Sequence, residues 1–360
     1  MPSKIKVVLF EDTMEARSAI LDMLTKHLAS DDAVITFEGI QESEEEAQRT
    51  YEDRIESTLK NPPYGDVTLV LADRDLSKSP SYGGLSVNSV AAACRRLAIP
   101  VASYARQAEP EDDFTWRGRW EEGHIVLRFS EDEDGLARQA AVVARGFVEI
   151  TAKLVEMEIK AGSSPAKILA ALLGKLEYSD KIALYAVGDQ NRLTDIPRKA
   201  QHSEDWLKRM SCFLGYWLWD SLLRYPGVFV NEVAAASYLN ISANDFQEPK
   251  VQDIFQQALY QGPFADPKKL QWWRGMLDEI VSREDCADGL ELVRKKVSSE
   301  ISGSQCCVNP SKSAGYYCII SRQPVSLENS KGGLSWFPRG ADLTRVSKPK
   351  FEEYGPWLGT

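Results

Sequence analysis

The feature of this sequence that most constrains its fold is an alternation of short apolar runs with helix-type segments in the first 150 residues. Each apolar run is brief and bounded by charged or turn-forming residues, as in strands that are buried on both faces. The runs lie at 5–10, 33–40, 67–72, 99–105 and 124–130. Helix-type patterns lie at 13–29, 41–60, 84–97 and 131–160, and the tryptophan-containing stretch 106–123 stands where a fourth helix would be. Such β-α units predict an open parallel sheet with helices on both faces and right-handed crossovers.

Acidic residues follow two of these runs. Glu11 and Asp12 come after KVVLF, and Asp73 comes after VTLVLA. In an open parallel sheet, ligands bind at the carboxyl ends of the strands, and a strand order of 2-1-3-4-5 makes the first and third strands neighbours. Three carboxylates would then converge, which is costly unless a cation or a proton is held among them. All-oxygen, hard ligands favour Mg²⁺ over zinc. Taken singly, Asp12 or Asp75 would be an ordinary turn or N-cap residue.

Residues 1–150 resemble the receiver domain of bacterial two-component response regulators. The segments that carry this resemblance are VVLFEDTMEARSAILDML, LVLADRDLS, YGGLSVNSVAAACRRLAIPV and IVLRFSEDEDGLA. The resemblance implies a five-stranded flavodoxin-like sheet in which Asp73 accepts a phosphoryl group from the phosphohistidine of a histidine kinase or phosphotransfer protein. It also implies that Glu11, Asp12 and Asp73 hold Mg²⁺, with the backbone carbonyl of Asp75 as a further ligand.

Three positions depart from the family pattern. Arg128 stands where the family has a lysine at the end of strand five, and arginine is a wider, planar donor. The serine or threonine that binds the phosphoryl group at the end of strand four aligns with Ala105, while Ser103 lies two residues earlier. Ile125 stands where strand five usually carries an aromatic residue, with Tyr104 nearby. Two readings stay open: a phosphorylation-competent receiver, in which Ser103 and Arg128 contact the phosphoryl group, and a degenerate receiver used as an interaction scaffold.

The remainder of the chain predicts a mainly helical domain. The segment AGSSPAK, at 161–167, breaks the 131–160 helix with an N-cap serine and a first-turn proline. We therefore expect a receiver-like domain at 1–150, a helical output or interaction domain at 151–302, and a turn-rich region at 303–360 packed on the helical domain. The aromatic segment 203–225 is expected to be the core helix of the second domain, and the 131–160 helix is a candidate for homodimerisation.

The output of the second part is less constrained by its sequence. Residues 231–247 echo a helix-turn-helix, which leaves a transcription regulator as one alternative. No arginine or lysine lies between Arg224 and Lys250, so nucleic-acid binding is disfavoured. Residues 151–360 show no Ser-His-Asp set, Walker loop, GxGxxG or HExxH motif, so no separate catalytic site is visible and enzymatic activity there is left open. Zinc binding is left open by four cysteines, Cys286, Cys306, Cys307 and Cys318. Their spacing does not form the paired CxxC motifs of a typical zinc site.

Charge and hydropathy limit which partners and which cellular compartment we expect for the protein. The net charge of −10 comes from the first 150 residues, whose 28 Asp and Glu against 17 Lys and Arg give −11, while the rest of the chain carries +1. That part is a poor surface for phosphate backbones. No apolar run is long enough to cross a bilayer, and the N-terminal residues lack the apolar region of a secretory signal. Six cysteines over 360 residues fit reduced thiols. We expect a cytoplasmic signalling protein with no membrane partner.

Overall fold

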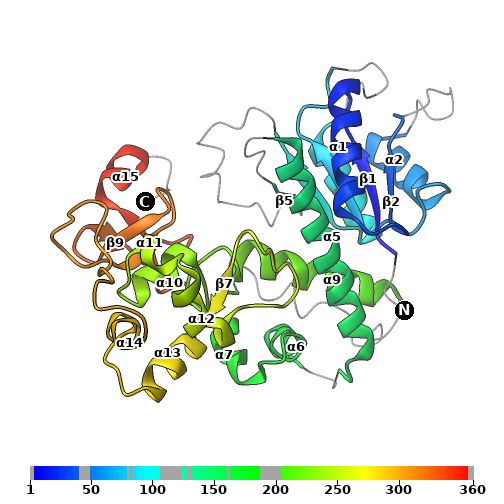
Figure 1. Cartoon of the computed structure of the whole chain (residues 1–360). Coiled ribbons are helices and arrows are strands. Elements are labelled where there is room, and N and C mark those ends of the chain that lie inside the picture. The colour runs from blue at the N-terminus through cyan, green and yellow to red at the C-terminus, as the bar shows by residue number, and fades with distance from the viewer. Residues whose placement is uncertain are drawn as a thin grey trace. The chain divides into compact units, whose positions relative to one another are not determined.

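A computed structural model of the chain describes residues 4–39, 49–78, 82, 85–105, 124–127, 132–159, 163–186 and 204–355. The chain divides into two compact units (Figure 1). Unit 1 comprises Met1–Ser163 and Thr194–Trp217, and unit 2 comprises Ser164–Leu193 and Leu218–Thr360. In the described ranges, no helix is both long and apolar enough to cross a membrane.

Unit 1 is built on a parallel five-stranded sheet in the order β2-β1-β3-β4-β5, which confirms the predicted fold class. Its strands are β1 (Lys6–Phe10), β2 (Ala33–Thr36), β3 (Leu69–Asp73), β4 (Val101–Tyr104) and β5 (Ile125–Val126). The central strands are buried on both faces, as their continuous apolar runs predict. In register, Phe10 pairs with Ala72, and Asp73 pairs with Tyr104. The last residues of β1 and β3 therefore lie side by side at one edge of the sheet.

Helices cover both faces of this sheet. They are α1 (Met14–His27), α2 (Tyr51–Lys60), α3 (Val87–Leu97) and α5 (Glu133–Glu156), and a further helix, α9 (Glu204–Trp217), packs on α5. Helices α1 and α5 pack against each other, and α2 packs against α3. A single core joins α2 and α3 to alternate strand residues such as Val8, Val70 and Val101. The early part of the expected 41–60 helix, at 41–48, and the stretch 106–123 lie outside the described residues.

Helix α9 belongs to unit 1, although its aromatic sequence was expected to form the core of the second domain. It packs on α5, where the Phe147 and Tyr216 rings meet edge to face at 5.6 Å. The Tyr216 hydroxyl accepts a hydrogen bond from the Val101 backbone N–H over 2.8 Å. The apolar face of α9 is therefore buried against the α/β unit. The chain then enters unit 2 through a π-helical turn, η6 (Leu218–Leu222).

Unit 2 is mainly helical, as the sequence predicted. Its helices are α6 (Pro165–Leu172), α7 (Ser179–Ala183), α10 (Glu232–Tyr238), α11 (Ala243–Phe246), α12 (Pro249–Ile254), α13 (Arg274–Arg283), α14 (Gly289–Lys296) and α15 (Lys348–Tyr354), with short 3-10 turns η4 (Leu176–Tyr178) and η7 (Gln256–Ala258). Ser164 caps α6 and Pro165 opens it, as expected from AGSSPAK. An antiparallel pair, β6 (Phe229–Asn231) and β7 (Gln271–Trp273), carries aromatic side chains into the core. The ring centroids of Phe229 and Trp273 lie 4.3 Å apart there.

The C-terminal region holds more regular structure than its turn-rich sequence indicated. A turn-rich region was predicted at 303–360, whereas a four-stranded sheet forms there in the order β10-β11-β8-β9. Its strands are β8 (Gly315–Cys318), β9 (Gln323–Ser326), β10 (Ser330–Lys331) and β11 (Thr344–Ser347). Strands this short have no clear sequence period, so their pairing depends on contacts distant in the sequence. One such contact is the hydrogen bond from the Ser237 hydroxyl on α10 to the Tyr316 carbonyl on β8.

Candidate functional site

The carboxylates of Glu11, Asp12 and Asp73 meet at the carboxyl edge of the unit 1 sheet. One oxygen from each lies within 4.8 Å of the others. All three side chains are buried, with exposed fractions of 0%, 6% and 3%. Glu11 and Asp12 directly follow β1, and Asp73 is the last residue of β3, the strand that pairs with β1. The convergence predicted from the sequence is therefore present.

Both oxygens of Glu11 accept hydrogen bonds. Oε1 accepts from the backbone N–H of Thr13 over 2.8 Å. Oε2 accepts from the Tyr104 hydroxyl over 2.7 Å. The backbone carbonyl of Glu11 accepts from Nε of Arg17, a residue in the first turn of α1, over 2.9 Å. The acid is thus tied to the loop, to the following helix and to β4, so that its position is fixed by three separate elements.

Backbone N–H groups also donate to the other two acids. Asp12 Oδ2 accepts from the backbone N–H of Lys78, and Asp73 Oδ1 accepts from the backbone N–H of Asp75 over 3.1 Å. These bonds orient both carboxylates from the loop that follows β3. The Asp75 side chain is exposed and turns to Ser77, whose hydroxyl donates a hydrogen bond over 2.6 Å. That bond lowers the pKa of Asp75. The metal-ligand role that the resemblance implies for Asp75 uses its backbone carbonyl, so the side chain can form this turn with Ser77.

The donor set fits Mg²⁺. Three carboxylates supply hard oxygen ligands only, and their number suits a cation that keeps part of its water shell. Burial of three like charges within 4.8 Å is unfavourable without a compensating cation or proton. Across the ranges that the structure describes, these acids form the one group of three or more His, Cys, Asp or Glu side chains that meets such a distance criterion. The site is compatible with a divalent metal, with magnesium as the chemical expectation.

The other two residues predicted for the site have different outcomes. Ser103 pairs with Ala72, so its side chain lies on the opposite face of the sheet from Asp73. Its hydroxyl is buried and has no hydrogen-bond partner among the described residues. Arg128 lies outside the described residues. The structure therefore brings Glu11, Asp12 and Asp73 together and places Ser103 apart from them.

Tyr104 is the site residue whose role the sequence did not reveal. It pairs in register with Asp73, is fully buried, and donates its hydroxyl hydrogen bond to Glu11. The sequence signal was its place at the end of an apolar run beside Ala105, the position aligned with the phosphoryl-binding hydroxyl. The sequence could not show which residues of VASY share a face with Asp73, because every one of them is compatible with a buried strand.

The cysteines do not form a metal cluster among the described residues. All six are free thiols, and none joins a group of three or more potential ligands. Cys306 and Cys318 are buried in a small apolar core with Val325. Cys318 Sγ accepts a hydrogen bond from the backbone N–H of Ser347 over 3.2 Å. These thiols act as packing residues in the C-terminal sheet.

The helix-turn-helix echo corresponds to two short helices. Helix α10 ends at Tyr238, and Asn240 turns the chain with a φ of 60°. Helix α11 then spans only four residues and buries Phe246. One turn of helix offers few side chains to a DNA groove. This geometry gives the transcription-regulator alternative no specific support.

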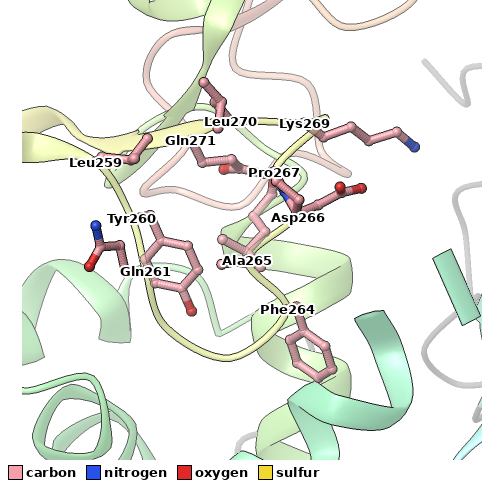
Figure 2. A pocket seen from close by; sticks show the side chains of 11 residues that line it. Leu259, Tyr260, Gln261, Phe264, Ala265, Asp266, Pro267, Lys269, Leu270 and Gln271 are labelled. Carbon is pink, nitrogen blue, oxygen red and sulfur yellow. The ribbon is translucent and has the colours of Figure 1, made fainter. Parts of the chain in front are cut away.

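Unit 2 contains a pocket of about 270 Å³ under the 259–271 loop (Figure 2). The Tyr260 ring lies inside the loop, and Phe264 has a φ of 67°. Gln271 Nε2 donates to the Leu223 carbonyl over 2.9 Å. Lys269 and Asp266 are the charged residues of the lining, which has no serine, cysteine or histidine. The lining can form hydrogen bonds but contains no paired nucleophile and base. The acidic cluster of unit 1 is therefore the stronger candidate for a functional site.

No protein-family model matches this chain, and a search of curated proteins finds no match. The sheet topology and the geometry of the acidic cluster are therefore the features that bear on function.

Proposed function

We propose that this chain is a response-regulator-like signalling protein that accepts a phosphoryl group on Asp73, with Mg²⁺ held by Glu11, Asp12 and Asp73. The observation that carries the proposal is the convergence of three buried carboxylates at the ends of β1 and β3 in a 2-1-3-4-5 sheet. Open parallel sheets bind their ligands at this edge. The family resemblance of residues 1–150 assigns the same positions to the same chemistry.

The way in which Asp73 is held supports the acceptor role. The backbone N–H of Asp75 fixes one carboxylate oxygen, which orients the group at the end of β3. In the transfer, an Asp73 oxygen forms a bond to phosphorus while the bond from phosphorus to the donor histidine breaks, and the imidazole leaves with that electron pair. The metal would neutralise charge on the phosphoryl group. Glu11 and Asp12 would hold the cation beside the acceptor, and the backbone carbonyl of Asp75 would complete the ligand set.

The proposed partner is a histidine kinase or phosphotransfer protein, and the proposed output lies in unit 2. Helix α5 contacts both α1, which begins at the acidic loop, and β3, which carries Asp73. Added negative charge at Asp73 changes the electrostatics at this edge, and Arg128 would be drawn toward it. We infer that α5 transmits the change by altering how the helical output part packs.

A degenerate receiver that serves as a protein-interaction scaffold is the second candidate. The observation that favours it lies at the end of β4: Ala105 stands where the family places a small hydroxyl residue, and Tyr104 stands in register with Asp73. A buried aromatic side chain there leaves less space beside the acceptor. On this alternative, the sheet edge is retained for docking and Asp73 is not phosphorylated.

The test is phosphorylation of the full chain by acetyl phosphate with and without Mg²⁺, read by intact mass. We expect a Mg²⁺-dependent gain of one phosphoryl group that Asp73→Asn abolishes. The matched control is Asp75→Asn, because the Asp75 side chain is exposed and only its backbone is assigned a role. Labelling of Asp73→Asn at the wild-type level, or an unlabelled wild type, would leave the scaffold alternative.

A further inference from the structure

The side chain of Tyr104 spans the end of β3. Strand β3 lies between β4, which carries Tyr104, and β1, which precedes Glu11. Two strand intervals amount to about 9.6 Å. The hydroxyl nevertheless reaches Glu11 Oε2 over 2.7 Å, so the side chain must cross the strand that ends in Asp73. Tyr104 is fully buried, which holds the ring in this position.

Two hydrogen bonds orient the Glu11 carboxylate. A carboxylate offers about four lone-pair sites on its two oxygens. Thr13 N–H uses one site on Oε1, and the Tyr104 hydroxyl uses one on Oε2. Together the two hydrogen bonds fix the plane of the carboxylate. Hydrogen bonds of this kind to a ligating carboxylate orient it and tune metal affinity.

We propose that Tyr104 is a positioning residue of the metal site, and that β4 of this protein serves the metal ligand Glu11 rather than the phosphoryl group. The inference rests on the proposed function of the acidic cluster. In the family pattern, the hydroxyl at the end of strand four contacts the phosphoryl group. Here the β4 residue in register with Asp73 directs its hydroxyl to Glu11, and the nearest serine, Ser103, lies on the opposite face of the sheet.

The first experiment measures metal binding to the full chain. Tyr104→Phe removes only the hydroxyl, and we expect its affinity for Mn²⁺ to fall about tenfold. Electron paramagnetic resonance of free Mn²⁺ gives the dissociation constant, and competition gives that of Mg²⁺. The matched control is Tyr64→Phe, which removes another buried hydroxyl in unit 1, one that donates to the Thr36 carbonyl over 3.2 Å. The control should keep wild-type metal affinity.

The second experiment separates metal positioning from contact with the phosphoryl group. For Tyr104→Phe, the Mg²⁺ concentration that gives half-maximal labelling by acetyl phosphate should rise, while the rate at saturating Mg²⁺ stays within about twofold of wild type. If the hydroxyl had only a structural role, Tyr104→Phe would lower thermal stability without changing the Mg²⁺ concentration for half-maximal labelling.

The outcomes distinguish this inference from the proposed function. Unchanged metal affinity in Tyr104→Phe overturns the inference and leaves the proposed function standing. A rate that falls more than about tenfold at saturating Mg²⁺ assigns the hydroxyl to the phosphoryl group, and also overturns it. A wild-type protein that binds neither Mn²⁺ nor Mg²⁺ overturns both.

Discussion

At the scale of single residues, the site is governed by repulsion among three buried acids. Two unit charges about 4 Å apart interact by about 4 kcal/mol at an effective dielectric constant near 20. The hydrogen bonds from Thr13, Tyr104, Lys78 and Asp75 offset part of this cost. These hydrogen bonds hold the acids together despite their like charge, and a divalent cation would relieve repulsion among them.

Like-charge repulsion predicts that Asp73→Asn is more stable than the wild type when no divalent cation is present. Removing one of three clustered charges should raise the free energy of unfolding by about 1–3 kcal/mol in a chelator. Urea denaturation with and without Mg²⁺ measures this, and Mg²⁺ should stabilise the wild type but not the variant. A variant less stable than the wild type in the chelator would show that hydrogen bonding to Asp73 outweighs the repulsion.

At the scale of elements, the contact between α5 and α9 defines unit 1 beyond its sheet. Gly215 on α9 lies against the Phe147 ring on α5, and a Cβ atom at position 215 would meet that ring at 2.2 Å. The Thr151 hydroxyl on α5 and the Ser211 hydroxyl on α9 are 2.9 Å apart, which adds a polar contact. The two helices approach closely because one of them has no side chain at the crossing.

We therefore predict that Gly215→Ala destabilises the protein, although it improves helix propensity. Alanine in place of glycine within a helix normally gains about 1 kcal/mol. Overpacking against Phe147 costs about 1–3 kcal/mol, so the net change should be a loss. Thermal or urea denaturation followed by circular dichroism gives the sign of the change in the free energy of unfolding.

A double-mutant cycle provides the control for this prediction. Phe147→Leu removes the ring that a new Cβ would meet, so Gly215→Ala should cost less in that background. Additive effects of the two substitutions would argue that Phe147 is not the source of the loss.

At the scale of the whole molecule, buried tyrosines tie stability to alkaline pH in both units. Burial raises the pKa of Tyr82 in unit 1 and of Tyr185 and Tyr317 in unit 2 above the ordinary value of 10.0. The unfolded chain loses these protons above pH 10 while the folded chain retains them. Stability from this source is therefore complete below pH 10 and falls as the pH rises further.

We predict that the free energy of unfolding falls above pH 10 by about 1.4 kcal/mol per pH unit for each of these tyrosines. Denaturation at a series of alkaline pH values gives the slope, and tyrosinate absorbance should appear together with unfolding. Tyr185→Phe should lower the slope by the share of one group. Tyrosinate absorbance that develops fully before any loss of helical signal would contradict the prediction.

The sequence by itself determined the sheet, its strand order and the meeting of Glu11, Asp12 and Asp73. The apolar runs predict the strands and place the acids at their ends, and the resemblance to receiver domains implied the strand order that the structure has. Tertiary structure alone decided that Tyr104, and not Ser103, shares a face with Asp73, because a one-residue change of register moves a side chain to the other face. It also decided that α9 joins unit 1, since an apolar helix face does not specify its partner. The short C-terminal strands likewise depend on pairing partners far along the chain.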